Sequence, residues 1–164
     1  MQKHIYVIFL ILASSLVLKA QTTETANVTE VINRLFLGMH KADSSMVRSV
    51  FAKEVTMATA TKNKEGNPVL RREYSINDFL KSVGKQQPES LTEEIWNLKI
   101  QIDGDFAQAW CDYAFYVGNK FNHCGVDAFQ LYKSADGWKI FHLADTRRKE
   151  NCTVPEDIQK KHKP

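Results

Sequence analysis

The chain of 164 residues has no internal repeat, no low-complexity tract and no linker-like run that would divide it into domains. Cysteine is scarce, since three residues allow one disulfide in an exported chain and leave one thiol over. The formal charge is only +3, which gives little sign of the basic face or stripe that a nucleic-acid binder needs. These features predict one ordinary domain that is large enough for a genuine core and binds no nucleic acid.

Only one long apolar run is present, at the N-terminus. A basic start at Lys3 precedes IYVIFLILASSLVL (residues 5–18), which ends in Lys-Ala before the polar Gln21. This arrangement is typical of a secretory signal peptide, which we expect to be cut after Ala20. The run is too short to span a bilayer comfortably and no stop-transfer segment follows, although an uncleaved anchor remains the alternative. Removal of the leader lowers the formal charge to +1, and we expect a secreted or periplasmic protein.

Helical periodicity marks three segments before residue 90. The segment that opens with Asn27 places five apolar residues on one face: Val31, Ile32, Leu35, Phe36 and Met39. Asp43 can cap a second helix over SSMVRSVF, and Ser75 can cap a third over INDFLKSV. The threonine- and valine-rich segment EVTMATAT and the short VLRRE between these helices predict two strands.

From Thr92 onward the period changes to two. Four strand-like runs follow one another: EEIWNLKIQI, FAQAWCDYAFYV, GVDAFQLYK and WKIFHLADTR. The segments between them are short enough for hairpins. Short helices followed by an antiparallel meander predict an α+β domain with the helices on one face of the sheet.

The final hairpin, VDAFQLYKSADGWKI (residues 126–140), resembles the corresponding hairpin of the nuclear transport factor 2-like superfamily, also called SnoaL-like. Its Asp-Gly turn and Trp-x-Ile ending carry this resemblance. Asp127, four residues before Leu131, is similar to an acid common in the branch named for lumazine binding. The whole ending, with HCG at residues 123–125 and DTRR at residues 145–148 followed by a cysteine, resembles a group of exported bacterial members of that branch.

The resemblance implies a cone-shaped, curved antiparallel sheet wrapped over N-terminal helices. It divides the chain into a signal peptide (1–20), a polar lead-in (21–26), a nuclear transport factor 2-like domain (27–148) and a polar tail (149–164). A homodimer is expected because members of the superfamily often pair through their sheets. The superfamily includes isomerases, dehydratases, polyketide cyclases and transport factors, so the fold leaves the function open. We expect no cofactor.

The cysteines suggest a disulfide. The SADG turn pairs Leu131 with Ile140 and would place Cys124 near Arg147, so that Cys152 could fold back to meet it. A loop of about 29 residues closed in this way would be worth roughly 3–4 kcal/mol and would tether the tail at Cys152. Free or differently paired thiols are the alternative. A metal site is not expected, because the spacing of the cysteines and histidines matches no zinc pattern.

The same register predicts a site. Asp127, Phe129 and Leu131 should share a sheet face with Trp138, Ile140 and His142, and Asp127 should lie diagonal to His142 at about 7–8 Å. Tyr113 and Phe115 occupy the apolar face of their own strand. An acid, an imidazole and a phenol on a concave apolar surface could support proton transfer. The catalytic candidates are Asp127, His142 and Tyr113, and the expected pocket walls are Phe115, Phe129, Leu131, Trp138 and Ile140.

Other interpretations stay open at this point. Asp127 and His142 could form a satisfied buried pair without function. A register slip of one residue would expose the other face instead, with Trp110, Asp112, Tyr116, Gln130, Asp145 and Arg147. The segment ADTRRKEN could bind an anion, although a salt bridge between Asp145 and Arg147 is simpler. The tail that contains His162 is expected to be mobile.

The sequence therefore predicts an exported protein that binds an unknown, largely apolar small molecule in the cone. The alternatives are a cofactor-free isomerase, dehydratase or hydrolase, or a structural module of the cell envelope.

Overall fold

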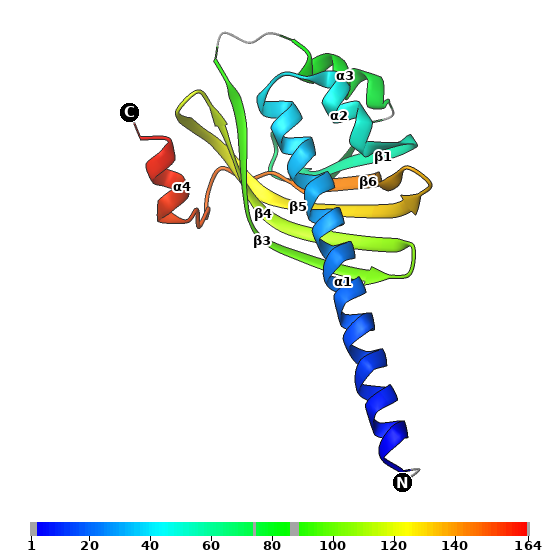
Figure 1. The fold of residues 1–164 in the computed structure, drawn as a ribbon. Helices are drawn as coiled ribbons and strands as arrows, with labels where there is room; N and C mark the ends of the chain where they lie inside the picture. Colours follow the sequence, from blue (N-terminus) through cyan, green and yellow to red (C-terminus); the bar gives the residue numbers. More distant parts are fainter. Residues whose placement is uncertain (1–2, 74, 86–88, 164) are drawn as a thin grey trace.

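The computed structural model describes residues 3–73, 75–85 and 89–163, with side chains from residue 21 onward except that of Glu73. The chain runs through α1 (Lys3–His40), α2 (Ser44–Val50), β1 (Phe51–Lys62), β2 (Pro68–Glu73) and α3 (Ile76–Val83). It continues through β3 (Leu91–Asp103), β4 (Phe106–Val117), β5 (Lys120–Ser134), β6 (Gly137–Thr146) and α4 (Glu156–Lys161). In Figure 1 the curved sheet wraps around the second half of α1, with α2 and α3 at one end.

The strands form one six-stranded sheet in the order β2-β1-β6-β5-β4-β3. Neighbouring strands are antiparallel except β1 and β6, which pair in parallel. The sheet is curved and does not close. Its concave face holds α1, α2 and α3, and α4 lies on the convex face. The predicted α+β cone with N-terminal helices is confirmed.

The helices begin as expected with one exception. The side chain of Asp43 accepts a hydrogen bond from the Met46 amide (2.9 Å), and Ser75 Oγ accepts one from the Asn77 amide (3.2 Å). Both therefore cap helices, as predicted. The expected start at Asn27 is wrong, because α1 already begins at Lys3. No proline or glycine precedes Gly38 in the chain, so nothing in the backbone interrupts the helix there.

The core lies between the concave face of the sheet and α1. Val28, Ile32 and Leu35 of α1 are almost fully buried in it. The sheet contributes Phe129, which packs edge-on against Phe36 at a ring distance of 6.2 Å. The buried residues of α1 recur at a spacing of three and four, which is why this amphipathic segment docks as a helix.

A bulge in β6 decides which side chains face the core. Leu131 pairs with Ile140 as predicted, but the register shifts by one residue beyond this point, so that Gln130 pairs with His142. Phe141 is the extra residue, and it packs on the convex side against Phe106 and Tyr132. Because side chains alternate along a strand, the bulge exchanges the two faces of β6 after Ile140.

The C-terminal segment is fixed to the convex face. A disulfide joins Cys124 and Cys152, as predicted. Ile158 of α4 is buried against Ala114 and Tyr116 on that face. His162 stacks on the Tyr116 ring at 3.7 Å and its side chain is only 10% exposed. The expected mobility of this tail is therefore wrong, because the disulfide and the aromatic stack together hold it in place.

Within the described part of the chain, no helix is long and apolar enough to cross a membrane. The side chains of the predicted leader lie outside that part, so the leader stays a prediction.

Candidate functional site

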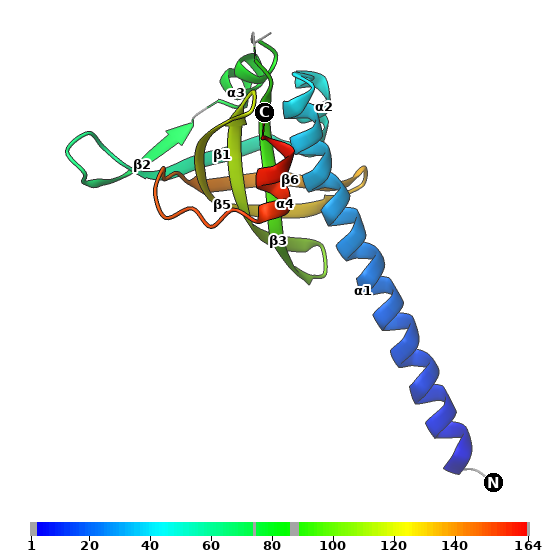
Figure 2. The ribbon, with the colours of Figure 1, turned by 90° about the vertical axis from the view of Figure 1, so that its left-hand side faces the viewer.

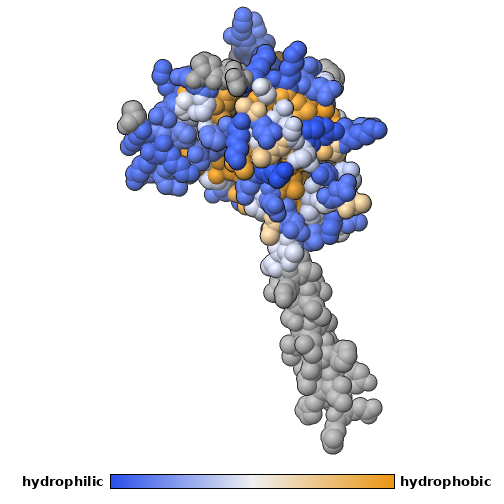
Figure 3. Space-filling view, turned by 45° about the horizontal axis from the view of Figure 1, so that its top comes forward, coloured by the Kyte–Doolittle hydropathy of each residue, from blue (hydrophilic) through white to orange (hydrophobic). Residues whose placement is uncertain are grey.

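A cavity of about 510 Å³ lies between the concave face of the sheet and the helices. Its apolar walls come from Phe36 and Met39 of α1, Phe79 of α3, Phe115 of β4 and Leu143 of β6. Figure 3 shows hydrophobic residues gathered in the middle of one end of the domain and framed by hydrophilic ones. The volume and the apolar lining are those of a small-molecule pocket.

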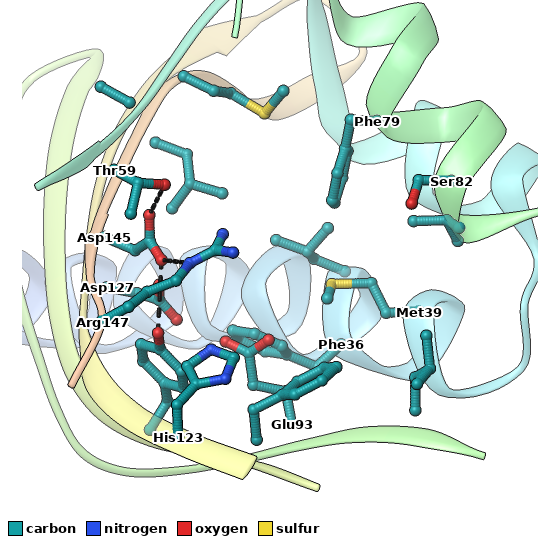
Figure 4. Close-up of a pocket in the computed structure, with 18 of the residues that line it drawn as sticks. Phe36, Met39, Thr59, Phe79, Ser82, Glu93, His123, Asp127, Asp145 and Arg147 are labelled. Atoms are coloured by element: carbon teal, nitrogen blue, oxygen red, sulfur yellow. Dashed lines mark hydrogen bonds and ion pairs between the residues drawn. The ribbon is translucent and has the colours of Figure 1, made fainter. Parts of the chain in front are cut away.

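Asp78 and Ser82 lie on α3, but the other polar side chains of the cavity gather on its sheet side (Figure 4). They come from different strands, which the sheet brings side by side: Thr59 of β1, Glu93 of β3, Tyr113 of β4, His123 and Asp127 of β5 and Asp145 of β6, with Arg147 just beyond β6. The register of the strands explains this grouping, because Asp127 pairs with Asp145 on one side and with Cys111 on the other. A polar cluster and an apolar wall thus face the same space.

Asp145 is the best-connected residue of the cluster. It accepts hydrogen bonds from Thr59 Oγ1 (2.5 Å) and Arg147 Nε (2.7 Å), and a longer one from the Tyr113 hydroxyl (3.4 Å). The same hydroxyl donates to the Thr146 carbonyl at 2.8 Å. Burial, followed by the charges of Asp145 and Glu93, raises the pKa of Tyr113, so the phenol stays protonated. These contacts fix the orientation of the Arg147 guanidinium.

Asp127 is the buried acid of the site. It is only 4% exposed, and its Oδ2 accepts no hydrogen bond from any N–H or O–H group of the described residues. Burial and the nearby Glu93 raise its pKa well above the usual value. The carboxyl group of Glu93 lies close enough to raise the pKa of Asp127 further. Two carboxyl groups so placed can share a hydrogen bond only while the pair holds a proton.

Glu93 has a pKa near neutrality. Burial raises it to about 7, and the hydrogen bond from Asp127 opposes this rise without cancelling it. A carboxyl group that titrates near pH 7 can both take and return a proton. The Glu93–Asp127 pair is therefore the part of the cavity with the clearest acid–base chemistry.

His123 is held in the neutral form. Burial and the charge of Arg147 lower its pKa to about 4. Its ring meets Tyr113 edge-on at 5.6 Å and lies at a tilt against Phe115 at 5.0 Å. Its Nδ1 lies 2.8 Å from the side-chain oxygen of Asn122, which can only accept a hydrogen bond, so Nδ1 donates and Nε2 is left as an acceptor.

The structure brings three of the predicted site residues to the cavity, namely Tyr113, Phe115 and Asp127. The other expected pocket walls are buried in the core instead of lining the cavity: Phe129, Leu131, Trp138 and Ile140. The indole of Trp138 donates to Glu24 at 2.7 Å.

The expected pairing of Asp127 with His142 is wrong. The bulge in β6 turns His142 to the convex side, where its Nδ1 meets Thr56 Oγ1 at 2.7 Å. The same bulge brings Leu143, Asp145 and Arg147 to the concave side, and the expected salt bridge between Asp145 and Arg147 forms there. Asp145 thus takes the place beside Asp127 that His142 was expected to fill.

Glu93 is an acid of the cavity that the sequence interpretation missed. Alternation along EEIWNLKIQI places Glu93 on the same side as Ile95, and this signal was available. The signal is weak because a second acid, Glu94, follows directly, and the sequence does not show which of the two faces the solvent. Glu94 does lie outside, where it binds Lys161 of α4 at 2.9 Å.

Among the described residues, no three His, Cys, Asp or Glu side chains are placed to hold a metal ion. Of the acids of the cavity, Asp145 is bound by Arg147 and Thr59.

Comparison with known proteins identifies the family. Residues 23–143 match the family described as "Putative lumazine-binding", so the chain belongs to that family. No curated protein matches the chain.

Solved structures agree on the fold. A nuclear transport factor 2-like protein of unknown function from Shewanella baltica shares 21% identity, with 79% of this chain and 97% of that chain covered and a TM-score of 0.60. A nuclear transport factor 2-like superfamily protein from Salmonella enterica serovar Typhimurium also shares 21% identity, with 81% and 96% covered and a TM-score of 0.61. A third, from Novosphingobium aromaticivorans, has 12% identity, 90% and 94% covered and a TM-score of 0.63. At these identities the likeness defines the fold and not the activity.

Proposed function

We propose that this protein binds a small, largely apolar molecule in the cavity, with one polar edge of that molecule directed at the Glu93–Asp127 pair. A cavity of about 510 Å³ with apolar walls and a polar cluster on one side supports this proposal. An interior filled with side chains would have suited a purely structural module, and the open volume favours binding instead.

The chemistry of the pair indicates the polar edge of the ligand. The buried Oδ2 of Asp127 accepts no hydrogen bond from an N–H or O–H group of the described residues. Because the Glu93–Asp127 pair lines the cavity and can hold a proton, it can both donate a hydrogen bond to a ligand and accept one from it. A flat molecule with a hydrogen-bonding edge and an apolar body fits both parts of the cavity.

A substitution that fills the cavity tests this proposal. Ser82 lies on α3 at the cavity wall, and Ser45 lies exposed on α2. Ser82→Trp should abolish binding of the neutral fluorescent probe N-phenyl-1-naphthylamine, because the indole takes the space that the probe needs. Ser45→Trp adds the same side chain elsewhere and should leave binding within about twofold of the wild type. Equal binding by all three proteins would contradict a site in the cavity.

A second candidate function is proton transfer without a cofactor. The pKa of Glu93, about 7, and its shared proton with Asp127 favour it. Glu93 takes the place beside Asp127 that was first given to His142, and either carboxyl group could act as the base. Tyr113 lies at the same wall, with its O–H donated to the Thr146 carbonyl. Proton exchange of 2-tetralone in D₂O, followed by NMR, measures such activity directly.

The variants Asp127→Asn and Glu93→Gln separate the two functions. For an enzyme, either substitution should lower the exchange rate by about 100-fold or more while the affinity for the neutral probe changes little. Wild-type exchange no faster than in buffer would leave binding without catalysis.

We also propose that the protein is exported from the cytoplasm. The leader-like residues 1–20 and the disulfide between Cys124 and Cys152 support it together, since structural disulfides persist in oxidising compartments. Mass spectrometry of the protein recovered from the periplasm or medium should find an N-terminus at Gln21. A thiol count on the unfolded, unreduced protein should find one free cysteine, Cys111. An intact N-terminus would contradict cleavage after Ala20.

A homodimer that pairs through the convex face is the proposed assembly. Trp110, Phe106 and Tyr132 are 53%, 41% and 41% exposed there, an unusual concentration of large aromatic residues on one side of a sheet.

A further inference from the structure

A second hollow, of about 930 Å³, lies outside the cavity, between the hairpin of β1 and β2 and the segment that follows β6. Figure 2 shows that hairpin and that segment on the same side of the sheet. The lining includes Val69 and Leu70 from β2 and Asn122 from β5. We call this hollow the basic groove.

The charge of the basic groove has one sign. Lys62 enters it from β1, and Arg147, Arg148 and Lys149 enter it from the segment after β6. No Asp or Glu is among the described residues that line it. Four cations that converge from two separate parts of the chain, without a lining acid, make a favourable place for an anion.

The groove and the cavity share a border. His123 and Arg147 line both. Arg147 is anchored by its Nε, which donates to Asp145 at 2.7 Å, and its Nη atoms donate to none of the described residues. In Figure 4 its guanidinium extends from Asp145 towards the cavity. A ligand that lies in the cavity could therefore reach the groove past these two side chains.

We propose that the ligand carries an anionic head group, a carboxylate, sulfonate or phosphate, that lies at Arg147 and in the basic groove while its apolar body fills the cavity. This inference rests on the proposed binding function. It adds the charge of the ligand's head group and the end of the cavity at which that group lies.

The acids of the cavity indicate at which end the anionic head group lies. Glu93, Asp127 and Asp145 face the cavity beyond Arg147, so an anionic group placed deep in it would meet three carboxyl groups and one guanidinium. The groove offers four cations instead. The head group is thus stabilised only at the outer end, and the apolar body is left to pack between Phe36 and Phe79.

A matched pair of probes tests the charge. N-phenyl-1-naphthylamine and 8-anilinonaphthalene-1-sulfonate have the same ring skeleton and differ by the sulfonate. Both should bind the wild type by fluorescence titration, and the anionic probe should bind more tightly. Its affinity should fall as NaCl is raised from 0.05 to 0.5 M, whereas that of the neutral probe should not, because salt screens exposed charges.

A double variant tests the groove. Arg148→Gln with Lys149→Gln removes two cations that line the groove and not the cavity. It should weaken the anionic probe by about tenfold and the neutral probe by less than about twofold. Lys53→Gln with Lys99→Gln removes the same charge from exposed positions that line neither hollow and should leave both probes within about twofold.

The outcomes are distinct. Equal affinities of the wild type for the two probes, or equal weakening of the anionic probe by both double variants, would overturn the anionic head group and leave the cavity function standing. Binding of neither probe by the folded wild type would overturn both.

Discussion

Gly125 occupies a place in β5 where any side chain would collide with the neighbouring strands. A Cβ atom there would lie 1.8 Å from the Thr146 carbonyl oxygen and 2.6 Å from Cε1 of Tyr113. The first of these is a backbone atom, so it cannot move aside without breaking the sheet. The close approach also lets the Tyr113 hydroxyl reach the Thr146 carbonyl. Gly125 is thus required for the polar cluster of the cavity as well as for the sheet.

Gly125→Ala should lower the free energy of unfolding by about 3 kcal/mol or more, because a collision with backbone forces strands apart. Urea unfolding measures the change. Gly84→Ala is the matched control: Gly84 has a helical backbone, and its nearest neighbours to a new Cβ lie at 3.4 Å. The control should change stability by less than about 1 kcal/mol. Equal stabilities of the two variants would contradict the collision.

Glu93 makes the stability of the protein depend on pH. Its folded-state pKa of about 7 lies above the ordinary value of 4.5. Between these values the folded chain holds more protons than the unfolded chain, so stability falls as the pH rises from 4.5 to 7 and stays low above 7. Glu93→Gln removes the titration. At pH 8 this variant should be more stable than the wild type by about 1–3 kcal/mol, and near pH 4 the two should be alike.

Urea unfolding at pH 4, 6 and 8 measures this difference. Glu54→Gln, an equal change of charge at an exposed position of β1, should alter stability by less than about 0.5 kcal/mol at every pH. A Glu93→Gln variant that is less stable than the wild type at pH 8 would contradict a raised pKa.

At the level of the elements, periodicity predicted nearly every helix and strand, and cap residues located the starts of α2 and α3. The bulges could not be predicted in the same way. In β3, Asn97 has a φ of 54° and the register shifts between Trp96 and Lys99. In β6 the extra residue is Phe141, whose aromatic side chain suits a regular strand equally well.

The site was only half predictable for this reason. Asp127 and Tyr113 precede the bulge in β6, and alternation assigns them to the correct face. His142 and Asp145 follow the bulge, and alternation assigns them to the wrong face. Arg147 follows the strand, so the same bulge decides that it faces the cavity. A single inserted residue, whose position depends on tertiary packing, thus moves a histidine out of the site and an acid into it.

The disulfide secures α4 to the sheet. Cys124 and Cys152 are 28 residues apart in the chain, and the cross-link should contribute about 3 kcal/mol by limiting the unfolded state. Cys152→Ser should lower the free energy of unfolding by about this amount and speed hydrogen exchange in residues 152–163. A reductant should bring the wild type to the same stability and leave the variant unchanged. A wild type that is indifferent to the reductant would contradict this role.

The convex face of the whole molecule has two parts, one covered by α4 and one exposed. At one end α4 covers Ala114 and Tyr116 through Ile158, with His162 stacked on the Tyr116 ring. At the other end Trp110 and its aromatic neighbours are exposed. A second copy of the chain can therefore dock only where α4 does not lie, so the tail limits the proposed dimer interface to the aromatic end of the sheet.

Trp110→Arg should convert the proposed dimer to a monomer, because it places a charge in an apolar contact. Light scattering coupled to size-exclusion chromatography measures the mass of the wild type and the variant. Phe121→Arg is the matched control, since Phe121 is 42% exposed but packs beside Tyr116, near α4. The control should remain dimeric. A monomeric wild type would contradict the proposed dimer, and a Trp110→Arg variant that still has the dimer mass would place the interface elsewhere on the molecule.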